Sequence, residues 1–396
     1  MAYSYWKNNI GDKQAVFNLY FRNNPFGGGY AVAAGLELAF RAIKDYSFSK
    51  DSLEYLGSLK TERGNPVFEN RFLDYLENLK LTVDINGIEE GRIVFPFEPL
   101  IRVKGSIIQC QLLETILLNI INFSTLIATK ACRITNAAKG RPVLEFGLRR
   151  AQGFDGGLSA SRAAYIGGCT GTSNLFAGKR LGIPVKGTHG HSWVLFFPHE
   201  KEAFKAYAEV MPENTIFLVD TYNTLNGIKT AVETINELKQ KKSCLNGIRL
   251  DSGDLAYLSQ KGRRILDEGG FPNAKIIASN DLDEYIIESL IEQKAAIDIF
   301  GVGTNLITGK DQPALGGVYK LTAIENEQGR WTPKLKISEQ PIKINHPGIQ
   351  KVRRYYDEEG AMGADLIYDE FENINKNEFI VDSNYEFKRK RTDQFF

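Results

Sequence analysis

Histidine and aspartate side chains follow short apolar runs in the middle of the chain. Two histidines, His189 and His191, lie in the glycine-rich segment GTHGHSW, and Asp220 follows the next apolar run, in FLVDTY. A carboxylate beside an imidazole fixes the ring nitrogen that carries the proton, as a nucleophilic histidine requires. A zinc site is the alternative, but the sequence offers no convincing third ligand. The pattern therefore predicts a nucleophilic histidine paired with Asp220.

The segment GIRLDSGD, residues 247–254, places one arginine and two aspartates together. Arg249 lies in an apolar run, where an unpaired guanidinium is costly, so an anionic ligand or a partner carboxylate is expected nearby. The carboxylate of Asp251 would suit a ribose diol or a Mg²⁺ ion on pyrophosphate. The structural alternative is that Asp251 begins a turn and that Asp254 is a helix N-cap. We favour the functional interpretation because the alternative leaves Arg249 unexplained.

Two further segments could bind anions. EFGLRRAQGFDGG, residues 145–157, places Arg149 and Arg150 after an apolar run and close to Phe146, which favours an anion clamp beside an aromatic face. FGVGTNLITG, residues 300–309, follows another apolar run, and its backbone N–H groups could hold a phosphate. A tight strand-to-helix turn explains this second segment equally well, because it has neither P-loop nor dinucleotide-binding spacing.

The elements that position these residues alternate between short apolar runs and helical patterns. A long amphipathic helix over residues 111–134 opens the region. Seven apolar runs follow it, at 143–146, 183–185, 216–219, 248–250, 275–278, 297–300 and 318–321. The alternation predicts an irregular TIM-like α/β barrel with parallel strands, whose C-terminal strand ends form the active site. The side chains and backbone expected at this mouth belong to Arg149, His191, Asp220, Arg249, Asp251, Ser279 and Gly301.

Length and composition agree with two domains and a cytoplasmic protein. We expect the barrel over residues 110–325 and a second, discontinuous α/β domain built from residues 1–109 and 326–396. The net charge of +1 gives no broad field for nucleic acid or a membrane surface. The four cysteines lack metal-binding spacing, and neither a signal peptide nor a credible membrane span is recognisable.

Seven segments taken together resemble the nicotinate phosphoribosyltransferase family of type II phosphoribosyltransferases. They occur in the family's order and spacing through almost the whole chain: FRNNPFGGGYAVAAGLE (21–37), EFGLRRAQGFDGGLSAS (145–161), GTHGHSWV (187–194), LVDTYNT (218–224), GIRLDSGD (247–254), IIASNDLDE (276–284) and GVGTNLIT with PALGGVYKL (301–321). The resemblance implies an α/β barrel, a second domain from the two chain ends, and a homodimer with shared active sites. It implies formation of nicotinate mononucleotide and pyrophosphate from nicotinic acid and phosphoribosyl pyrophosphate, assisted by ATP and Mg²⁺, in NAD salvage.

The resemblance also implies roles for individual residues. His191 matches the histidine that ATP phosphorylates, with Asp220 as its orienting partner, whereas His189 is less constrained and is given no catalytic role. Arg249 and Asp251 match residues that hold the nicotinate side and the ribose, with Asp251 also counted as catalytic. No residue is assigned to a metal. The expected substrate-binding residues are Phe146, Arg149, Ser173, Asn174, Arg249, Asp251, Ser279, Asn280, Gly301, Gly303 and Thr304.

The loop GTSNLFAG, residues 171–178, bears on the choice between nicotinic acid and nicotinamide. Relatives that use nicotinamide carry an aspartate in this loop, which accepts a hydrogen bond from the amide. Here the loop offers Ser173 and Asn174, neutral groups that do not repel a carboxylate, so we expect preference for nicotinic acid. The nicotinamide-specific relative and a non-catalytic phosphosugar-binding barrel are the alternatives.

The two ends of the sequence depart from the family pattern. Family members usually carry a segment ahead of the position matched by Met1, with a tyrosine that stacks on the nicotinate ring of the neighbouring subunit. They also carry a closing segment beyond the position of Phe396, and neither segment is in the printed sequence. The resemblance therefore implies either a trimmed sequence or a reduced activity.

Overall fold

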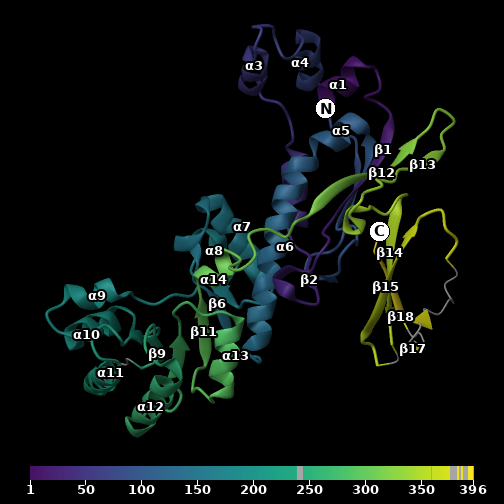
Figure 1. The fold of residues 1–396 in the computed structure, drawn as a ribbon. Helices are drawn as coiled ribbons and strands as arrows, with labels where there is room; N and C mark the ends of the chain where they lie inside the picture. The colour runs from purple at the N-terminus through teal and green to yellow at the C-terminus, as the bar shows by residue number, and fades with distance from the viewer. Residues whose placement is uncertain (239–243, 358, 375–380, 383–384, 387–390, 396) are drawn as a thin grey trace. The chain divides into compact units, whose positions relative to one another are not determined.

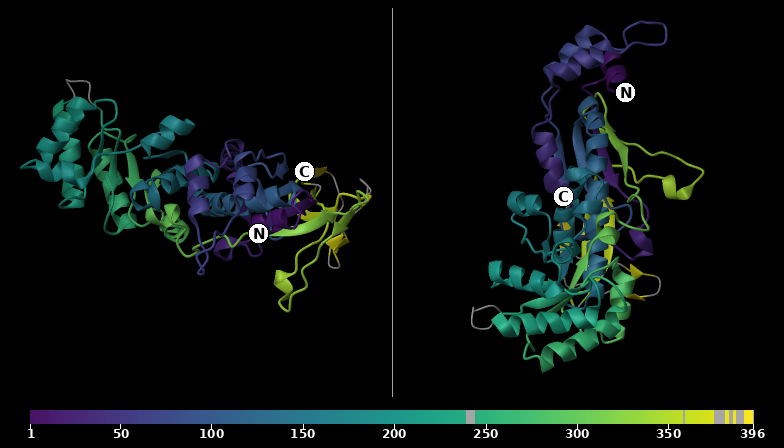
Figure 2. Two further views of the ribbon diagram at one scale, coloured as in Figure 1. Left: turned by 90° about the horizontal axis from the view of Figure 1, so that it is seen from above. Right: turned by 90° about the vertical axis from the view of Figure 1, so that its left-hand side faces the viewer.

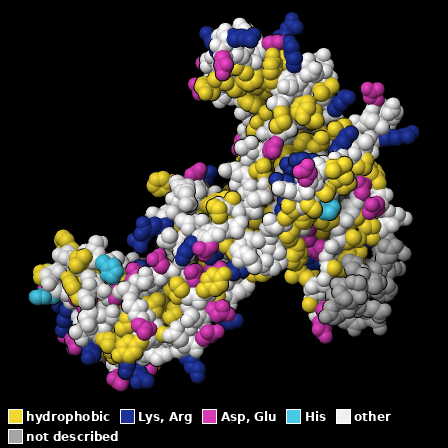
Figure 3. Space-filling view, in the orientation of Figure 1, with side chains coloured by type: hydrophobic (Ala, Val, Ile, Leu, Met, Phe, Trp, Pro, Cys, Tyr) yellow, Lys and Arg dark blue, Asp and Glu magenta, His cyan; other side chains and the backbone are white. Residues whose placement is uncertain are grey.

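The chain divides into two compact units that are discontinuous in sequence. The computed structural model describes residues 1–395, apart from 239–243, 358, 375–380, 383–384 and 387–390. One unit comprises Met1–Thr125 and Leu315–Phe396, and the other comprises Leu126–Ala314 (Figure 1). On the face drawn in Figure 3, basic and acidic side chains are interspersed, in keeping with the net charge of +1.

The first unit is built on a five-stranded antiparallel sheet with the order β13-β12-β1-β5-β3. Strand β1 lies at its centre, and every residue of β1 after the first is buried. The strands of this sheet are β1 (Gln14–Tyr20), β3 (Asp84–Gly87), β5 (Ile101–Ser106), β12 (Val318–Glu325) and β13 (Trp331–Pro333). A second sheet pairs β14 (Gln350–Tyr356) with β15 (Met362–Asp369) and β18 (Arg391–Phe395). Short pairs form between β2 (Ala31–Val32) and β4 (Ile93–Val94), and between β16 (Val381–Asp382) and β17 (Tyr385–Glu386). The helices are α1 (Ala2–Lys7), α2 (Leu36–Lys44), α3 (Lys50–Ser58), α4 (Asn70–Glu77) and α5 (Ile107–Leu112).

The second unit is built on a six-stranded parallel sheet with the order β7-β6-β11-β10-β9-β8. Its strands are β6 (Val143–Glu145), β7 (Gly171–Thr172), β8 (Ile216–Leu218), β9 (Gly247–Leu250), β10 (Lys275–Ala278) and β11 (Ile299–Val302). Its helices are α7 (Gly153–Ile166), α8 (Leu175–Leu181), α9 (His191–Phe196), α10 (Glu200–Val210), α11 (Thr224–Leu238), α12 (Leu255–Glu268), α13 (Glu284–Glu292) and α14 (Thr304–Ile307). Helix α12 packs against β9 and β10, and α7 and α8 pack beside β7. Figure 2 shows teal and green helices of this unit beside its strands. The predicted mixed α/β fold with a parallel sheet is therefore confirmed.

Three helices of this unit begin at side chains that cap them. Asn174, Asp254 and Asp283 each accept a hydrogen bond from the backbone N–H three residues later, at the starts of α8, α12 and α13. Such a cap contributes about 1 kcal/mol and fixes the residue at which the chain turns from loop to helix. The loops after the parallel strands are thereby held at defined lengths.

Helix α6 (Glu114–Ala137) is the predicted amphipathic helix, and it runs from the first unit into the second. It is long and apolar enough to cross a membrane by length and composition. However, 56% of its most apolar 18-residue stretch is buried inside the molecule, as in the core helix of a globular protein. Its burial accounts for its apolar sequence without a membrane.

Two of the seven predicted strands are not strands of the parallel sheet. Segment 183–185 contributes only one bridge, between Val185 and Thr172, and the two-residue strand β7 takes its place in the sheet. Segment 318–321 lies in β12, which pairs with β1 in the first unit. The chain passes from one unit to the other at residues 125/126, inside α6, and at 314/315, whereas the boundaries expected from the sequence were 109/110 and 325/326. Among the described residues, β7 and β8 are the two ends of the strand order and do not pair with each other.

Candidate active site

A cavity of about 620 Å³ lies at the C-terminal ends of the parallel strands in the second unit. This is the position at which ligands bind in parallel α/β folds, because the loops after the strands converge there. Residues from the ends of all six strands line it. The lining is Phe146, Arg149, Arg150, Ser173, Gly187, Thr188, Gly190, His191, Ser192, Leu218, Arg249, Asp251, Ser279, Asn280, Asp281, Gly301, Gly303 and Thr304.

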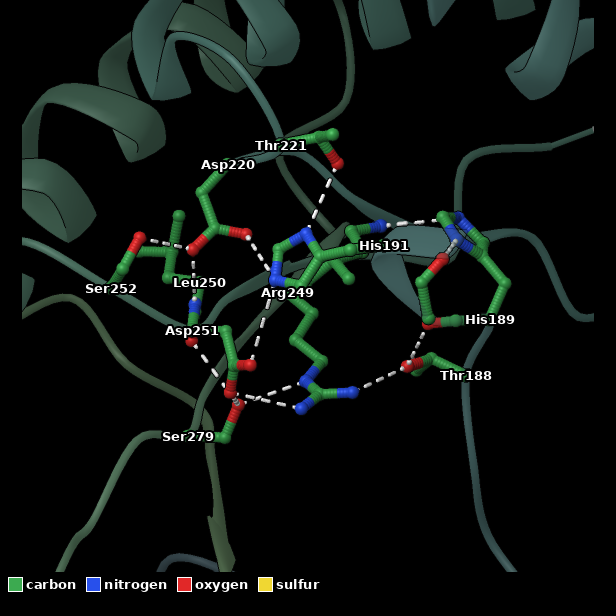
Figure 4. Close-up of polar contacts among 12 residues, drawn as sticks. Thr188, His189, His191, Asp220, Thr221, Arg249, Leu250, Asp251, Ser252 and Ser279 are labelled. Atoms are coloured by element: carbon green, nitrogen blue, oxygen red, sulfur yellow. Dashed lines mark hydrogen bonds and ion pairs between the residues drawn. The ribbon is translucent and has the colours of Figure 1, made fainter. Parts of the chain in front are cut away.

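Arg249, on β9, is held by three protein side chains (Figure 4). Its Nε donates to Ser279 Oγ at 2.8 Å, its Nη1 to Thr188 Oγ1 at 3.1 Å, and its Nη2 to Asp251 Oδ1 at 2.9 Å. Ser279 Oγ also donates to Asp251 Oδ1. Asp251 is thus the partner carboxylate of Arg249. Because this structural partner exists, the position of Arg249 on a strand does not decide between the functional interpretation and the turn-and-cap interpretation. Protein side chains therefore fix the guanidinium within the cavity.

Phe146 lies beside this arginine and against the glycine-rich loop after β11. The guanidinium carbon of Arg249 lies 5.6 Å from the centre of the Phe146 ring. A Cβ atom at Gly301 would lie 2.6 Å from the same ring, closer than side chains approach one another. Glycine at 301 is therefore required for the ring to lie over the strand end. A flat aromatic surface beside a cation suits a planar anion.

His191 is the first residue of α9, and its side chain is 41% exposed. Its Nδ1 lies 3.1 Å from the hydroxyl of Thr221. Its Nε2 faces two carboxylates, with Asp251 Oδ2 at 3.7 Å and Asp220 Oδ1 at 3.9 Å (Figure 4). These separations exceed a direct hydrogen bond but favour a proton on Nε2. The predicted proximity of histidine and aspartate is present, and the carboxylate lies on the Nε2 side of the ring.

The side chain of Asp220, which follows β8, is completely buried. Its Oδ2 accepts hydrogen bonds from the Asp251 N–H at 2.9 Å and from the Ser252 hydroxyl at 2.6 Å. Its Oδ1 has no hydrogen-bond partner among the described residues, so its negative potential acts on the imidazole. Burial, and then the charge of Asp220, raise the pKa of Glu200 to about 7.

The cavity unites most of the predicted site residues. Phe146, Arg149, Ser173, His191, Arg249, Asp251, Ser279, Asn280, Gly301, Gly303 and Thr304 all line it, and Asp220 lies behind His191. Asn174 does not line it. Its side chain caps α8 and donates to Ser161 Oγ at 3.2 Å, which leaves it 2% exposed. The expectation that Asn174 contacts substrate is therefore corrected, because its amide is used inside the protein.

The sequence did not single out two threonines of this site. Thr221 reaches Nδ1 of His191, and Thr188 reaches Arg249. Thr221 directly follows Asp220 in VDT, and Thr188 directly precedes His189 in GTH. This proximity to a motif residue is the signal in the sequence that could have indicated them. Arg150 lines the cavity as the second arginine of the predicted anion clamp.

Comparison with known proteins places this site in a family. A family model described as nicotinate phosphoribosyltransferase matches residues 142–359, and a model for the N-terminal domain of the same enzymes matches residues 1–122. The chain is 48% identical to the nicotinate phosphoribosyltransferase of Bacillus subtilis over 355 residues, which cover 89% of this chain and 71% of that protein. The chain belongs to the nicotinate phosphoribosyltransferase family.

Solved structures show the same fold. The crystal structure of human nicotinic acid phosphoribosyltransferase superposes with a TM-score of 0.83 at 28% identity, covering 100% of this chain and 86% of that one. A nicotinate-nucleotide pyrophosphorylase from Pyrococcus furiosus superposes with a TM-score of 0.70 at 24% identity, covering 94% of this chain and 81% of that one, which shows shared fold alone. The family resemblance seen in the sequence is confirmed, and the chain is a nicotinate phosphoribosyltransferase, an enzyme of NAD salvage.

Proposed function

We propose that the second unit joins nicotinic acid to phosphoribosyl pyrophosphate with the help of ATP, through phosphorylation of His191. The pyridine nitrogen attacks the anomeric carbon, the bond to pyrophosphate breaks, and nicotinate mononucleotide and pyrophosphate result. One observation carries the proposal: an imidazole facing two carboxylates lies in the same cavity as a fixed arginine and a glycine-rich loop. Each of these groups suits one part of the two substrates.

The base site is proposed between Phe146 and Arg249. The pyridine ring of nicotinic acid can stack on the face of Phe146 while the carboxylate of nicotinic acid accepts hydrogen bonds from a cation. Arg249 can supply that cation, because its guanidinium carbon lies 5.6 Å from the centre of the Phe146 ring. Ser173 lines the same cavity and is neutral, so it adds no repulsion toward a carboxylate. This arrangement supports preference for nicotinic acid over nicotinamide.

The sugar and phosphate site is proposed around Asp251, Ser279 and Asn280, with the loop Gly301, Gly303 and Thr304 for the 5′-phosphate. Backbone N–H groups of a glycine-rich loop can approach phosphate oxygens closely. Arg149 and Arg150 add positive charge at the same mouth. The transition state has oxocarbenium character, so fixed charges and orientation supply the catalysis and no strong base is needed.

ATP acts through His191 in this proposal. With the proton on Nε2, next to Asp220 and Asp251, Nδ1 keeps the lone pair that attacks the γ-phosphorus of ATP, and ADP leaves. The resulting phosphohistidine lies beside the pyrophosphate site, and its hydrolysis draws the reaction toward the mononucleotide. Turnover without ATP is expected to continue more weakly.

Mg²⁺ belongs to the substrates rather than to a resident metal site. Among the described residues no group of three or more histidine, cysteine, aspartate or glutamate side chains is arranged to hold a metal ion. The ion would enter bound to the pyrophosphate and triphosphate oxygens and neutralise their charge. Asp251, whose side chain is 23% exposed at the cavity, is one carboxylate able to contact it.

The setting of the reaction is proposed on the family's pattern. We propose a cytoplasmic homodimer with shared active sites, with the parallel-sheet domain carrying the chemistry and the domain from the two chain ends supporting the neighbouring subunit. Cross-linking and sedimentation of the purified chain test the dimer. A monomer with full activity would contradict it.

Product formation tests the proposed reaction. The purified protein is incubated with phosphoribosyl pyrophosphate, Mg²⁺ and either nicotinic acid or nicotinamide, with and without ATP. We expect nicotinate mononucleotide, faster with ATP, and little product from nicotinamide. Comparable product from both bases would move the chain to the nicotinamide-using relatives, and no product from either would favour a non-catalytic phosphosugar-binding barrel.

A further inference from the structure

His189 is a buried histidine that the reaction described above does not use. Its side chain is 9% exposed and does not line the cavity, although Thr188 and Gly190 on either side do. The ring packs edge-on against Tyr207, with 4.8 Å between ring centres, and lies 6.3 Å from Phe217. The backbone of this loop thus faces the cavity while the His189 ring points into the protein interior.

Both ring nitrogens of His189 have backbone partners. The Leu218 N–H donates to Nε2 at 3.2 Å, and Nδ1 lies 3.4 Å from the carbonyl oxygen of Gly190. Because Nε2 accepts a hydrogen bond, the proton of the neutral ring is on Nδ1, where it can be donated to the Gly190 carbonyl. Burial lowers the pKa of His189 to about 4, against the hydrogen bond with Gly190, which raises it, and the charge of Arg249 adds a smaller lowering effect. The ring therefore stays neutral near pH 7.

The hydrogen bond to Leu218 occupies the edge of the parallel sheet. Strand β8 is the last strand in the sheet order, and the Val219 N–H donates to Arg249 O on the β9 side at 3.2 Å. Because successive N–H groups of a strand point to opposite sides, the Leu218 N–H points away from β9. The His189 ring takes the place of a strand-to-strand hydrogen bond at this edge. An edge group that would otherwise need water or another strand is thereby satisfied.

This ring joins the two segments that form the histidine site. Gly190 directly precedes His191, and Leu218 lies two residues before Asp220 and three before Thr221. We propose that His189 is a positioning residue that holds the His191 loop against β8 and keeps His191 in register with Asp220 and Thr221 for phosphoryl transfer. The inference rests on the proposed role of His191 as the phosphate acceptor.

His189 ties the loop ahead of His191 to β8, while Trp193 holds α9 behind it through a hydrogen bond from its Nε1 to Ala203 O at 3.1 Å. A Cβ at Gly187 would meet nothing within 4 Å, and one at Gly190 would meet only the Ser192 hydroxyl, at 3.9 Å, so the glycines of the loop are not clamped by packing. Thr188 provides a further hold, through its hydrogen bond from Arg249. That bond fixes the start of the loop, whereas His189 fixes Gly190, the residue directly before the proposed phosphate acceptor His191.

The test compares two substitutions of His189 with a matched control. His189→Leu removes both hydrogen bonds and keeps an apolar side chain, whereas His189→Gln retains one acceptor and one donor. His199→Leu is the control, because His199 is exposed and lies at the start of α10. Labelling of His191 by radioactive ATP is measured together with turnover in the absence of ATP.

We expect His189→Leu to lower the rate of His191 labelling about ten- to a hundredfold, the effect of a misplacement of about 1 Å. The ratio of ATP-assisted to ATP-independent turnover should fall with it, whereas His189→Gln should restore much of the labelling and His199→Leu should match the unmodified enzyme. Equal labelling of the unmodified protein and His189→Leu would overturn the inference, as would folded Leu and Gln variants that are impaired alike. No labelling of the unmodified protein would instead contradict the phosphohistidine itself.

A measurement on the unmodified protein keeps the inference testable if His189→Leu does not fold. The ¹⁵N chemical shifts of its four histidines report which ring nitrogen carries the proton. We expect His189 to stay neutral with the proton on Nδ1 down to about pH 5, given its pKa of about 4. A proton on Nε2, or protonation in the ordinary range of histidine, would overturn the positioning role.

Discussion

His191 Nε2 and Asp220 Oδ1 face each other at 3.9 Å, and this oxygen of a completely buried carboxylate has no hydrogen-bond partner among the described residues. Its other oxygen is held by the Asp251 N–H and the Ser252 hydroxyl. A carboxylate held in this way favours the imidazole form with a proton on Nε2. The contact between these two residues therefore links the buried carboxylate of Asp220, in the loop after β8, to the reactivity of the His191 imidazole.

Replacing Asp220 by Asn tests this link. The amide oxygen can keep the hydrogen bonds now accepted by Oδ2, so the fold should be retained, while the charge facing His191 is lost. Loss of a charge-assisted interaction of about 2 kcal/mol corresponds to roughly a thirtyfold slower labelling of His191. Labelling at the unmodified rate would show that the buried carboxylate does not act on the ring.

Asp251→Asn separates a substrate role from a structural one. Asp251 accepts from Arg249 and Ser279 and is 23% exposed, so losing its charge should lower the melting temperature by only about 3 °C. We expect turnover to fall about a hundredfold or more, because the charge acts at the reacting sugar. Asp254→Asn is the matched control, since Asp254 caps α12 and asparagine caps equally well. A large loss of stability with activity per folded molecule retained would favour the turn-and-cap interpretation.

Ser173→Asp tests the choice of base. Ser173 lines the cavity, and a carboxylate there would repel the carboxylate of nicotinic acid. Catalytic efficiency with nicotinic acid should fall by roughly tenfold or more, the cost of a close like-charge contact, while nicotinamide gains relative to it. Ser173→Asn controls for size. An unchanged ratio between the two bases would place the base away from this loop.

The first unit contains a buried carboxyl whose protonation should make stability depend on pH. Burial, a hydrogen bond with Asp365 and the charge of Asp365 raise the pKa of Glu98 from 4.5 to about 9, despite Arg354 at 3.9 Å. Between these values the folded state binds one proton more than the unfolded state, so this group's contribution to stability is full below pH 4.5 and is lost as pH rises toward 9.

Glu98→Gln mimics the protonated carboxyl at every pH. The melting temperature of the variant relative to the unmodified protein should therefore rise steadily from pH 5 to pH 9, and thermal unfolding at several pH values measures it. A constant difference across this range would mean that Glu98 is ionised in the folded protein.

Motifs in the sequence predicted the convergence of the site because parallel strands bring their C-terminal ends together. Phe146 and Ser279 directly follow strands of one sheet, Arg249 lies one residue before the end of another, and the three meet in one cavity. The role of Asn174 was not predictable in the same way. Asparagine serves equally as a pocket residue and as a helix cap, and only the start of α8 at Leu175 decides between them.

Long-range pairing accounts for the parts of the fold that the sequence did not reveal. Strand β12 looks like another barrel strand, but it pairs with β1, about three hundred residues earlier in the chain, through contacts such as Tyr20 with Val318. Strand β7, with two residues, is too short for any periodic pattern to indicate.

Labelling with γ-³²P-ATP tests the central claim most directly, because the account requires the phosphate to be on His191 itself. The unmodified protein, incubated with Mg²⁺, should acquire an acid-labile, base-stable phosphate that phosphoribosyl pyrophosphate and nicotinic acid discharge. His191→Ala should lose the label and keep a weak ATP-independent formation of nicotinate mononucleotide. Labelling of His191→Ala at the level of the unmodified protein would contradict the account.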